Sequence, residues 1–226
     1  MFEFPIFLNL QTLACLVVGA GQVGRRKTGK LLQSGASSVC LLDPAPPGAD
    51  ELIFQEYAAF RRVCSEFSPA CLEGAGLVFA ATGNADLNEE IADLCAQRNI
   101  LCNVASNPEQ GRFVVPAAYE KAGFIWAVRN RANCPGLSRL LGLEFHEKLG
   151  MRHALAVELM QSLRPRIISS PLTQPLRSEL LGRLAEFAFN PTPAAWDELI
   201  SRAELPPLSG QEQALAARLI DLGAGQ

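Results

Sequence analysis

Residues 13–35 read LACLVVGAGQVGRRKTGKLLQSG, and this stretch decides the fold. It begins with a short apolar run over residues 13–18, of the kind that forms a buried strand. Residues 22–34 then space their apolar side chains as on a helix, which Gly35 ends. The glycine-rich turn between the two runs is therefore predicted to lead from a strand directly into a helix.

The same alternation of strand and helix signals continues to about residue 110. Further strands are expected at residues 38–42, 54–60, 77–82 and 100–104, with a second helix over residues 86–98. Continuous apolar strands separated by helices are typical of a parallel sheet that is covered on both faces. The sequence thus predicts an α/β fold with a doubly wound parallel sheet of the Rossmann type.

The turn itself carries a dinucleotide-binding pattern. In this pattern the first glycine permits the tight turn, the second lets the backbone approach a pyrophosphate, and the third lets helix and strand pack closely. The helix N-terminus then faces the phosphates. The residues concerned are Gly19, Ala20, Gly21, Gln22, Val23 and Gly24.

Asp43 ends the second predicted strand, 19 residues after Gly24. A carboxylate at this place can accept hydrogen bonds from the 2′-hydroxyl of an adenosine ribose. It favours NAD over NADP, because it would repel the 2′-phosphate of NADP. Two alternatives stay open: Arg25 and Arg26 could meet such a phosphate, and the glycine turn could be merely structural.

After residue 110 the pattern changes. Short apolar runs at residues 113–115 and 124–128 predict a small strand pair. Helical spacing follows, interrupted by prolines. The expected helices cover residues 133–149, 151–163, 176–189, 194–203 and 210–222. We therefore expect three parts, namely residues 1–110, a middle segment over 111–150 and a helical C-terminal domain over 151–226.

Charge is distributed unevenly along these parts. Residues 1–110 hold 7 Lys and Arg against 12 Asp and Glu, whereas residues 112–183 hold 11 against 5, and nine of those eleven are Arg. A basic segment of this kind could meet nucleic acid, a membrane surface or a multiply anionic small molecule. A scattered, solvated surface is the plainer alternative.

Composition limits where the protein works. With 49% hydrophobic residues, 19% charged residues and no apolar run of about 18 residues, the chain reads as globular without a membrane segment. Its start, MFEFPIFLNL, lacks the pattern of a signal peptide. The seven cysteines are odd in number and never spaced C-x-x-C, so neither a disulfide framework nor a zinc site is predicted. We expect a cytoplasmic protein.

Several stretches together resemble one family. They are FPIFLNLQTLACLVVGAGQVGRRKTGKLLQSGA, LVFAATGNADLNEEIADLCAQRNILCNV, RFVVPAAYEKAGFIWAV and CPGLSRLLGLEFHEKL. Over about residues 3–150 they are similar to the precorrin-2 dehydrogenases, the NAD-dependent module of siroheme synthases. The resemblance implies oxidation of precorrin-2 to sirohydrochlorin with hydride passed to NAD, and in some members insertion of ferrous iron. It also implies a homodimer in which residues 111–150 form the dimerisation and substrate-cleft segment.

The resemblance also points to individual residues. Gln22, Val23, Asp43 and Pro44 match the NAD contacts of the family. Thr82 ends the fourth strand beside the expected cofactor cleft. Asn103 lies at the carboxyl end of the next strand, where ligands bind in such sheets, and it is predicted to be catalytic.

Ser106 departs from the family pattern, which commonly has an acidic residue after the C-N-V element. That carboxylate is the family's usual candidate for proton transfer and metal chelation, and a serine hydroxyl is neither a general base near neutral pH nor a strong metal ligand. Ser106 is nevertheless the second catalytic candidate. Because the carboxylate is missing, we predict that dehydrogenase activity survives and ferrochelatase activity is weak or absent. No metal site is predicted. Glu109 and His146 are possible substitutes, and His146 would share a helical face with His153 if the helix continues through Gly150.

The basic segment suits a polycarboxylate substrate such as precorrin-2, because arginine can contact carboxylates in a bidentate manner.

Three alternative functions stay open. They are a bifunctional dehydrogenase and ferrochelatase, a non-catalytic carrier or regulator that binds tetrapyrrole or NAD, and an NAD sensor that binds nucleic acid. Nucleic acid is not expected as a partner, because neither a helix-turn-helix nor an RNP-like aromatic motif is present. The candidate anchors for the carboxylates of the substrate are Arg112, Arg129, Arg131, Arg139 and Arg152. Cys134 occupies the position of a serine that is phosphorylated in some members, so that regulation is not expected.

Overall fold

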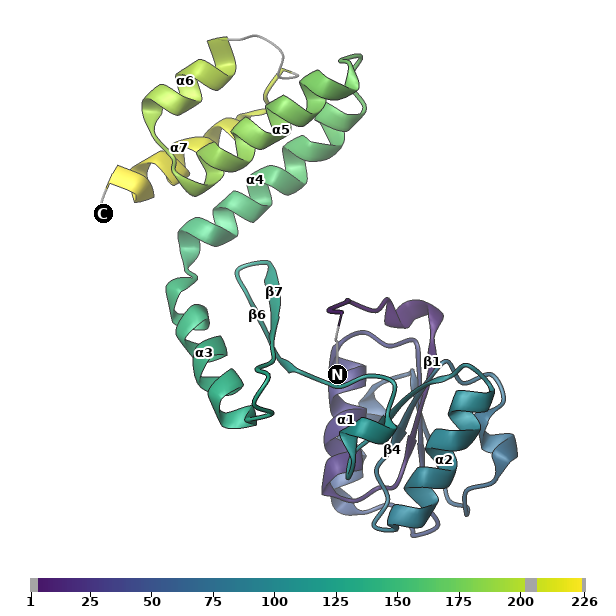
Figure 1. Cartoon of the computed structure of the whole chain (residues 1–226). Helices are drawn as coiled ribbons and strands as arrows, with labels where there is room; N and C mark the ends of the chain where they lie inside the picture. The colour runs from purple at the N-terminus through teal and green to yellow at the C-terminus, as the bar shows by residue number, and fades with distance from the viewer. Residues whose placement is uncertain (1–3, 202–206, 225–226) are drawn as a thin grey trace. The chain divides into compact units, whose positions relative to one another are not determined.

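The computed structural model describes residues 4–201 and 207–224. The chain divides into two compact units, Met1–Val115 and Pro116–Gln226, which are drawn in Figure 1. The middle segment and the helical tail, expected as separate parts, belong to one unit. The last two residues of the helix expected over 194–203 lie outside the described residues.

Five parallel strands form the sheet of the N-terminal unit, as far as the structure describes it, in the order β3-β2-β1-β4-β5. The predicted Rossmann-type sheet is thereby confirmed. Because β1 pairs with β2 on one side and with β4 on the other, the strand order reverses beside β1, which is where such sheets bind ligands. The strands are β1 (Ala14–Val18), β2 (Ser38–Leu42), β3 (Phe60–Val63), β4 (Leu77–Ala80) and β5 (Leu101–Val104).

Both faces of the sheet are covered, which explains the continuous apolar strands (Figure 1). On one face Val17 and Leu41 pack in a core with Leu31 of α1 (Gln22–Gln33) and Phe54 of the 3₁₀ helix η2 (Ala49–Glu56). On the other, Leu16 and Val78 pack with Ile91 of α2 (Ala85–Gln97) and Leu72 of η3 (Pro69–Leu72). Short 3₁₀ turns, η1 (Leu10–Thr12) and η4 (Pro108–Gln110), lie near the two ends of this unit.

Two strand predictions were wrong in position. Residues 54–60 fall mainly in η2 and the following turn, and the strand β3 begins only at Phe60. Its sequence, FRRV, holds two arginines, so its apolar pattern is too weak to find. Likewise residues 113–115 form no strand; the partner of the predicted strand over 124–128 is β6, whose AAYEK sequence alternates half-buried and exposed positions.

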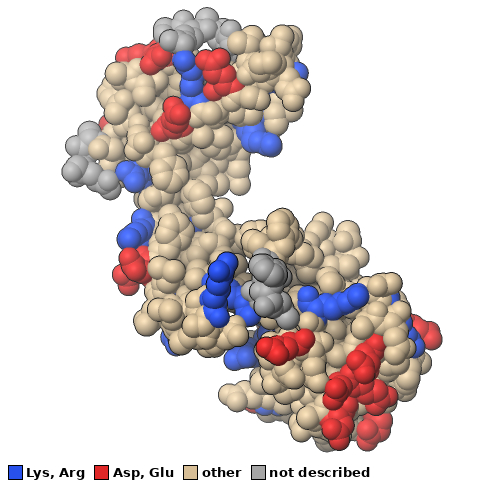
Figure 2. Space-filling view, viewed as in Figure 1, with Lys and Arg blue, Asp and Glu red and all other residues tan. Residues whose placement is uncertain are grey.

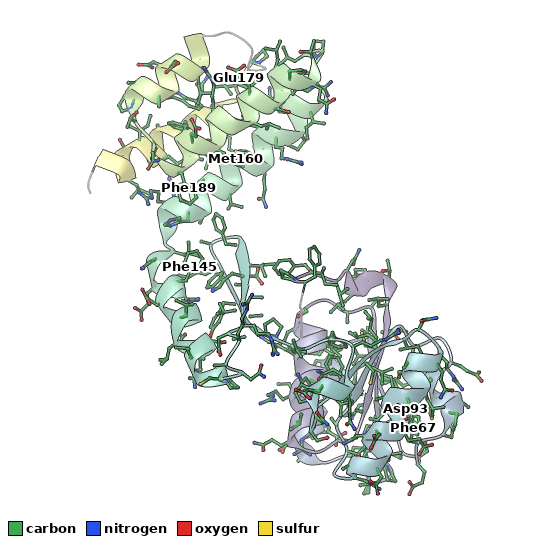
Figure 3. The ribbon with its side chains drawn as sticks, in the orientation of Figure 1. Phe67, Asp93, Phe145, Met160, Glu179 and Phe189 are labelled. Atoms are coloured by element: carbon green, nitrogen blue, oxygen red, sulfur yellow. The ribbon has the colours of Figure 1, made fainter. Side chains whose placement is uncertain are left out.

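A two-stranded antiparallel hairpin opens the C-terminal unit, formed by β6 (Ala117–Lys121) and β7 (Phe124–Val128). Its turn residues Ala122 and Gly123 both have positive φ, at 54° and 78°, as a tight hairpin turn requires. The hairpin packs on α3 (Pro135–Lys148), where a Cβ on Gly142 would lie only 2.0 Å from Cε2 of Tyr119. Glycine at this position therefore lets the aromatic ring lie directly on the helix. Phe145 of α3, labelled in Figure 3, packs edge-on against Trp126.

The remaining helices form a core of their own, centred on Leu159, Leu163, Leu184 and Leu219. Glu212 is only 1% exposed and ties α7 to α4, because its carboxylate accepts hydrogen bonds from Arg166, Ser162 and Ser209. The helices are α4 (Met151–Ile168), α5 (Gln174–Phe189), α6 (Pro193–Ser201) and α7 (Gly210–Ala224).

The helix does not continue through Gly150. α3 ends at Lys148, Gly150 is extended, and α4 begins at Met151. His146 and His153 therefore lie on different helices. The single helical face that their spacing suggested is thereby corrected.

None of the helices in the described part of the chain is both long and apolar enough to cross a membrane.

Candidate functional site

The glycine turn between β1 and α1 is built from three glycines with different surroundings. Gly19 has a φ of +101°, and a Cβ there would lie 2.5 Å from the carbonyl oxygen of Ala81. A Cβ on Gly24 would lie 1.8 Å from the carbonyl oxygen of Gly19. At Gly21, by contrast, a Cβ would meet no described atom within 4 Å. Packing of the chain thus requires the first and third glycines, and the second leaves open space beside the backbone.

The N-terminus of α1 offers free backbone donors next to this space. The N–H of Arg25 donates to the carbonyl oxygen of Gly21, at 3.0 Å, and closes the first helical turn. The N–H groups of residues 22–24 therefore have no partner within the helix. Gln22 and Val23 are exposed, and the first turn holds no acidic residue that would offset the positive end of the helix dipole. This arrangement fits a phosphate group.

Asp43 lies beside the glycine turn, as its position after β2 predicts. Its Oδ2 accepts a hydrogen bond from the N–H of Ala20 at 2.7 Å, and its Oδ1 accepts one from the N–H of Ala45 at 2.9 Å. A carboxylate has about four acceptor positions. Each oxygen of this half-buried group therefore keeps capacity for a ligand hydroxyl, while Pro44 is exposed next to it.

A buried amide joins the loops that follow β4 and β5. Asn88 of α2 is 1% exposed, and its Oδ1 accepts hydrogen bonds from the N–H and the hydroxyl of Thr82, at 3.1 and 2.8 Å. Its Nδ2 donates to the carbonyl oxygen of Thr82 at 3.1 Å and to the hydroxyl of Ser106 at 3.4 Å. The structure thus brings together the two predicted site residues, Thr82 and Ser106, through a residue that the sequence did not single out. The available signal was a polar side chain in the apolar stripe of α2, in register with Ile91, Ala92 and Cys95.

Asn103 and Arg112 are turned toward other parts of the unit. Asn103 is 5% exposed, and its Nδ2 donates to the carbonyl oxygen of Phe113 at 3.0 Å, so its catalytic role stays a prediction. The guanidinium of Arg112 contacts Oδ1 of Asn99 at 3.5 Å. Because Asn99 precedes β5, the structure places this arginine side chain at the amino end of the strand, away from the edge that carries the glycine turn.

The other predicted anchors belong to the C-terminal unit. Arg129 and Arg131 lie in the loop between β7 and α3, Arg139 lies in α3, and these three are exposed, whereas Arg152 lies at the start of α4 and is half-buried. Asn130, also missed in the sequence, organises this loop: its Nδ2 donates to the carbonyl oxygen of Cys134 and to the hydroxyl of Ser138, and its Oδ1 accepts from the N–H of Cys134. Two of the three exposed cations thus precede α3 in the chain and the third lies in its second turn, near a helix N-terminus that is also positive.

Acidic side chains gather instead on the N-terminal unit, over α2 (Figure 2). The exposed acids of this helix are Asp86, Glu89, Glu90 and Asp93. Within the described residues, no group of three or more His, Cys, Asp or Glu side chains is arranged to hold a metal ion.

Comparisons with known proteins agree with the geometry of the N-terminal unit. Residues 6–117 match the family described as "Putative NAD(P)-binding". The siroheme synthase of Methylobacillus flagellatus is 32% identical over 170 residues, which are 74% of this chain and 36% of that protein. The chain belongs to the siroheme synthase family. The predicted cofactor class, a nicotinamide dinucleotide, is thereby confirmed.

A second member of the siroheme synthase family, from Chromobacterium violaceum, matches nearly the whole chain. It is 30% identical over 231 residues, which are 98% of this chain and 47% of that protein. The chain thus spans between about a third and a half of the length of these curated relatives. Among solved structures, SirC, a precorrin-2 dehydrogenase, superposes with a TM-score of 0.69 and 17% identity, covering 88% of this chain and 98% of that one. This likeness shows that the fold is shared.

Proposed function

We propose that this chain is an NAD-dependent precorrin-2 dehydrogenase, which oxidises precorrin-2 to sirohydrochlorin. The observation that carries the proposal is the dinucleotide cradle of the N-terminal unit: the open space at Gly21, the free N–H groups of residues 22–24 and the carboxylate of Asp43. This cradle occurs in a chain whose relatives are named siroheme synthases and whose structural neighbour is named a precorrin-2 dehydrogenase.

Each part of the cradle has a separate task in this proposal. The backbone at Gly21, Gln22 and Val23 holds the pyrophosphate, and Asp43 holds the adenosine ribose and disfavours the extra phosphate of NADP. The bound NAD supplies the hydride acceptor. Thr82 and Ser106, which Asn88 holds together, line the carboxyl edge of the sheet, where ligands of such folds bind.

The proton released in the oxidation is proposed to leave through water, since Ser106 is exposed and its hydroxyl is no base near neutral pH. For the same reason insertion of ferrous iron, the substrate of the second reaction known in the family, is proposed to be weak or absent. Changing Ser106 to Asp restores a carboxylate at this place. We expect Ser106→Asp to raise iron or cobalt insertion into sirohydrochlorin, and strong insertion by the unchanged protein would contradict this part of the proposal.

The substrate is proposed to be held through its carboxylates. Arg129, Arg131 and Arg139 support this role, because they are exposed and lie around the N-terminus of one helix. Arg112 has weaker support, since its side chain extends toward the amino end of β5.

The cytoplasm is the proposed compartment. All seven cysteines, each within the described residues, are free thiols, which suits a reducing compartment.

A homodimer is the proposed assembly. In α3, Leu137, Leu140 and Leu141 are 55%, 68% and 55% exposed, and Ile125 of β7 is 59% exposed. Apolar patches of this kind mark protein interaction sites. We expect the protein to elute as a dimer in size-exclusion chromatography with light scattering, and Leu140→Asp to shift it toward the monomer. A monomeric parent protein would contradict the assembly without touching the proposed reaction.

The decisive experiment mixes the purified protein with NAD and freshly generated precorrin-2 under anaerobic conditions. The expected result is NADH formation together with the absorption spectrum of sirohydrochlorin. Tight binding of the tetrapyrrole without turnover would instead support the alternative of a non-catalytic carrier or regulator.

A further inference from the structure

We infer, on the basis of the proposed function, that the buried pair of Glu51 and Arg62 positions the Asp43 loop and thereby sets the preference for NAD over NADP. Neither residue belongs to the glycine turn or to the edge that carries Thr82 and Ser106. Both lie beneath the loop that follows β2, on the face of the sheet covered by η2. Their side chains are 4% and 10% exposed.

Arg62 binds the loop through its backbone oxygens. Its Nη1 donates to the carbonyl oxygens of Asp43 and Val63, at 2.9 and 2.7 Å, and its Nη2 donates to that of Ala45 at 2.8 Å. Its Nε donates to Oε2 of Glu51 at 2.7 Å. Four of the five N–H donors of the guanidinium are thereby engaged, so a single side chain fixes both the end of β3 and the start of the loop.

Glu51 closes the other end of the same loop. Its Oε1 accepts a hydrogen bond from the N–H of Gly48 at 3.3 Å, while its Oε2 accepts from Arg62. Residues 43–51, DPAPPGADE, are therefore held between one carboxylate and one guanidinium. Three of these residues are prolines, at 44, 46 and 47, which have no N–H to donate. Its own amides are few, so Arg62 holds the loop through the carbonyl oxygens of Asp43 and Ala45, and Glu51 holds it through the N–H of Gly48.

The pair of Glu51 and Arg62 acts on Asp43 in particular. Arg62 holds its carbonyl oxygen, whereas Ala20 of the glycine turn and Ala45 hold its carboxylate. Backbone and side chain of this residue are thus fixed at the same time, with the carboxylate beside the turn. A carboxylate that is held in place before binding loses less conformational entropy when a ribose arrives.

The charge of the pair matters as much as its geometry. An arginine near the ribose is the usual means of binding the 2′-phosphate of NADP. Here Glu51 neutralises Arg62, whose guanidinium is directed at the backbone of the loop and not at the ribose side. The guanidinium of Arg25 also lies at the glycine turn, where it donates to the carbonyl oxygen of Ala20 at 2.8 Å and pairs with Asp50 at 3.8 Å. Removing Glu51 leaves a positive charge beneath the Asp43 loop and weakens the repulsion of a phosphate.

Direct binding of NADH and NADPH, measured by fluorescence titration without any tetrapyrrole, tests this inference. Arg62→Lys keeps the charge but loses the fork of donors, and we expect it to raise the dissociation constant for NADH about tenfold. Glu51→Gln keeps the shape and removes the charge, and we expect the NADPH to NADH ratio of dissociation constants to fall about fivefold. Arg61→Lys is the matched control, since Arg61 is the adjacent residue of β3 and its guanidinium lies at 3.8 Å from Sγ of Cys40; it should leave both constants within about twofold.

A merely structural pair would lower the melting temperature while leaving the NADPH to NADH ratio as in the parent protein, and that result would overturn the inference. If Arg62→Lys does not fold, the ratio measured for Glu51→Gln decides the matter. A parent protein that binds neither dinucleotide would instead refute the proposed function, so the two failures are distinguishable.

Discussion

The two units build their proposed binding surfaces by different means. In the N-terminal unit the backbone itself forms the site, and buried polar side chains such as Asn88 and Arg62 hold that backbone in place. In the C-terminal unit exposed side chains, among them Arg131 and Arg139, form the basic surface around the start of α3. A backbone site tolerates almost no change at the residues that shape it, whereas a surface of separate side chains loses its affinity in small steps.

Gly24→Ala should break the N-terminal site most strongly. The added Cβ would lie 1.8 Å from the carbonyl oxygen of Gly19, so α1 and β1 could not keep their separation. We expect the free energy of unfolding to fall by about 3 kcal/mol or more, with loss of NADH binding. Urea unfolding and NADH titration measure the two effects. Gly21→Ala, whose Cβ meets no described atom within 4 Å, should keep the stability and lose only affinity; equal loss of stability in both variants would contradict the assignment.

The corresponding test of the C-terminal unit concerns Glu212. Burial alone would raise the pKa of this carboxyl group, but hydrogen bonds from Arg166, Ser209 and Ser162 outweigh it and lower the pKa to about 2 from the usual 4.5. The group therefore stabilises the folded state by about 3 kcal/mol above pH 4.5, and this contribution is lost as the pH falls from 4.5 toward 2.

Glu212→Gln should remove that contribution at neutral pH and flatten the dependence of stability on pH in this window. Chemical denaturation followed by tryptophan fluorescence measures it, since both Trp126 and Trp196 lie in the same unit as Glu212. Glu144→Gln is the control, because Glu144 is exposed and pairs with the exposed Lys148 one turn further along α3. An acid dependence that is the same in both variants would contradict the role of Glu212.

Asn88→Ala separates the site from the rest of the N-terminal fold. The change removes the hydrogen bonds that join Thr82 to Ser106 and leaves the N–H and carbonyl group of Thr82 without this partner, which we expect to cost about 2 kcal/mol of stability. We also expect kcat/KM for NAD to fall by about tenfold. Glu89→Ala, the next residue of α2 on its exposed side, should change neither quantity. Unchanged kcat/KM in Asn88→Ala would show that the loops keep their positions without the amide.

The smallest effects are expected for the arginines of the C-terminal unit. Arg131→Ala and Arg139→Ala should each raise KM for precorrin-2 about two- to fivefold, because each removes one proposed, solvent-exposed contact with a substrate carboxylate. NADH binding should stay as in the parent protein, and added salt should reduce the difference between variant and parent. Arg218→Ala, on the exposed side of α7, serves as the control. A larger effect on NADH than on precorrin-2 would contradict the division of tasks between the units.

Much of the N-terminal unit was predictable because its signals are local. The apolar runs predict β1, β2, β4 and β5 to within two residues, and the glycine pattern predicts the turn that leads into α1. Asp43 could be placed beside that turn from its distance along the chain alone. The strand β3 was predicted too early in the chain, because it holds two arginines and the partners of the buried Arg62 side chain lie on other segments.

Fold class, glycine turn and cofactor class were thus determined by the sequence itself, since each depends on residues that are neighbours along the chain. Only the tertiary structure decided that Asn88 joins Thr82 to Ser106, that Arg62 holds the Asp43 loop, and that the Arg112 side chain lies at the amino end of β5. These are hydrogen bonds between segments 6 to 19 residues apart. No periodic pattern encodes such a bond, because its partners meet only after the strands have paired and the helices have packed on them.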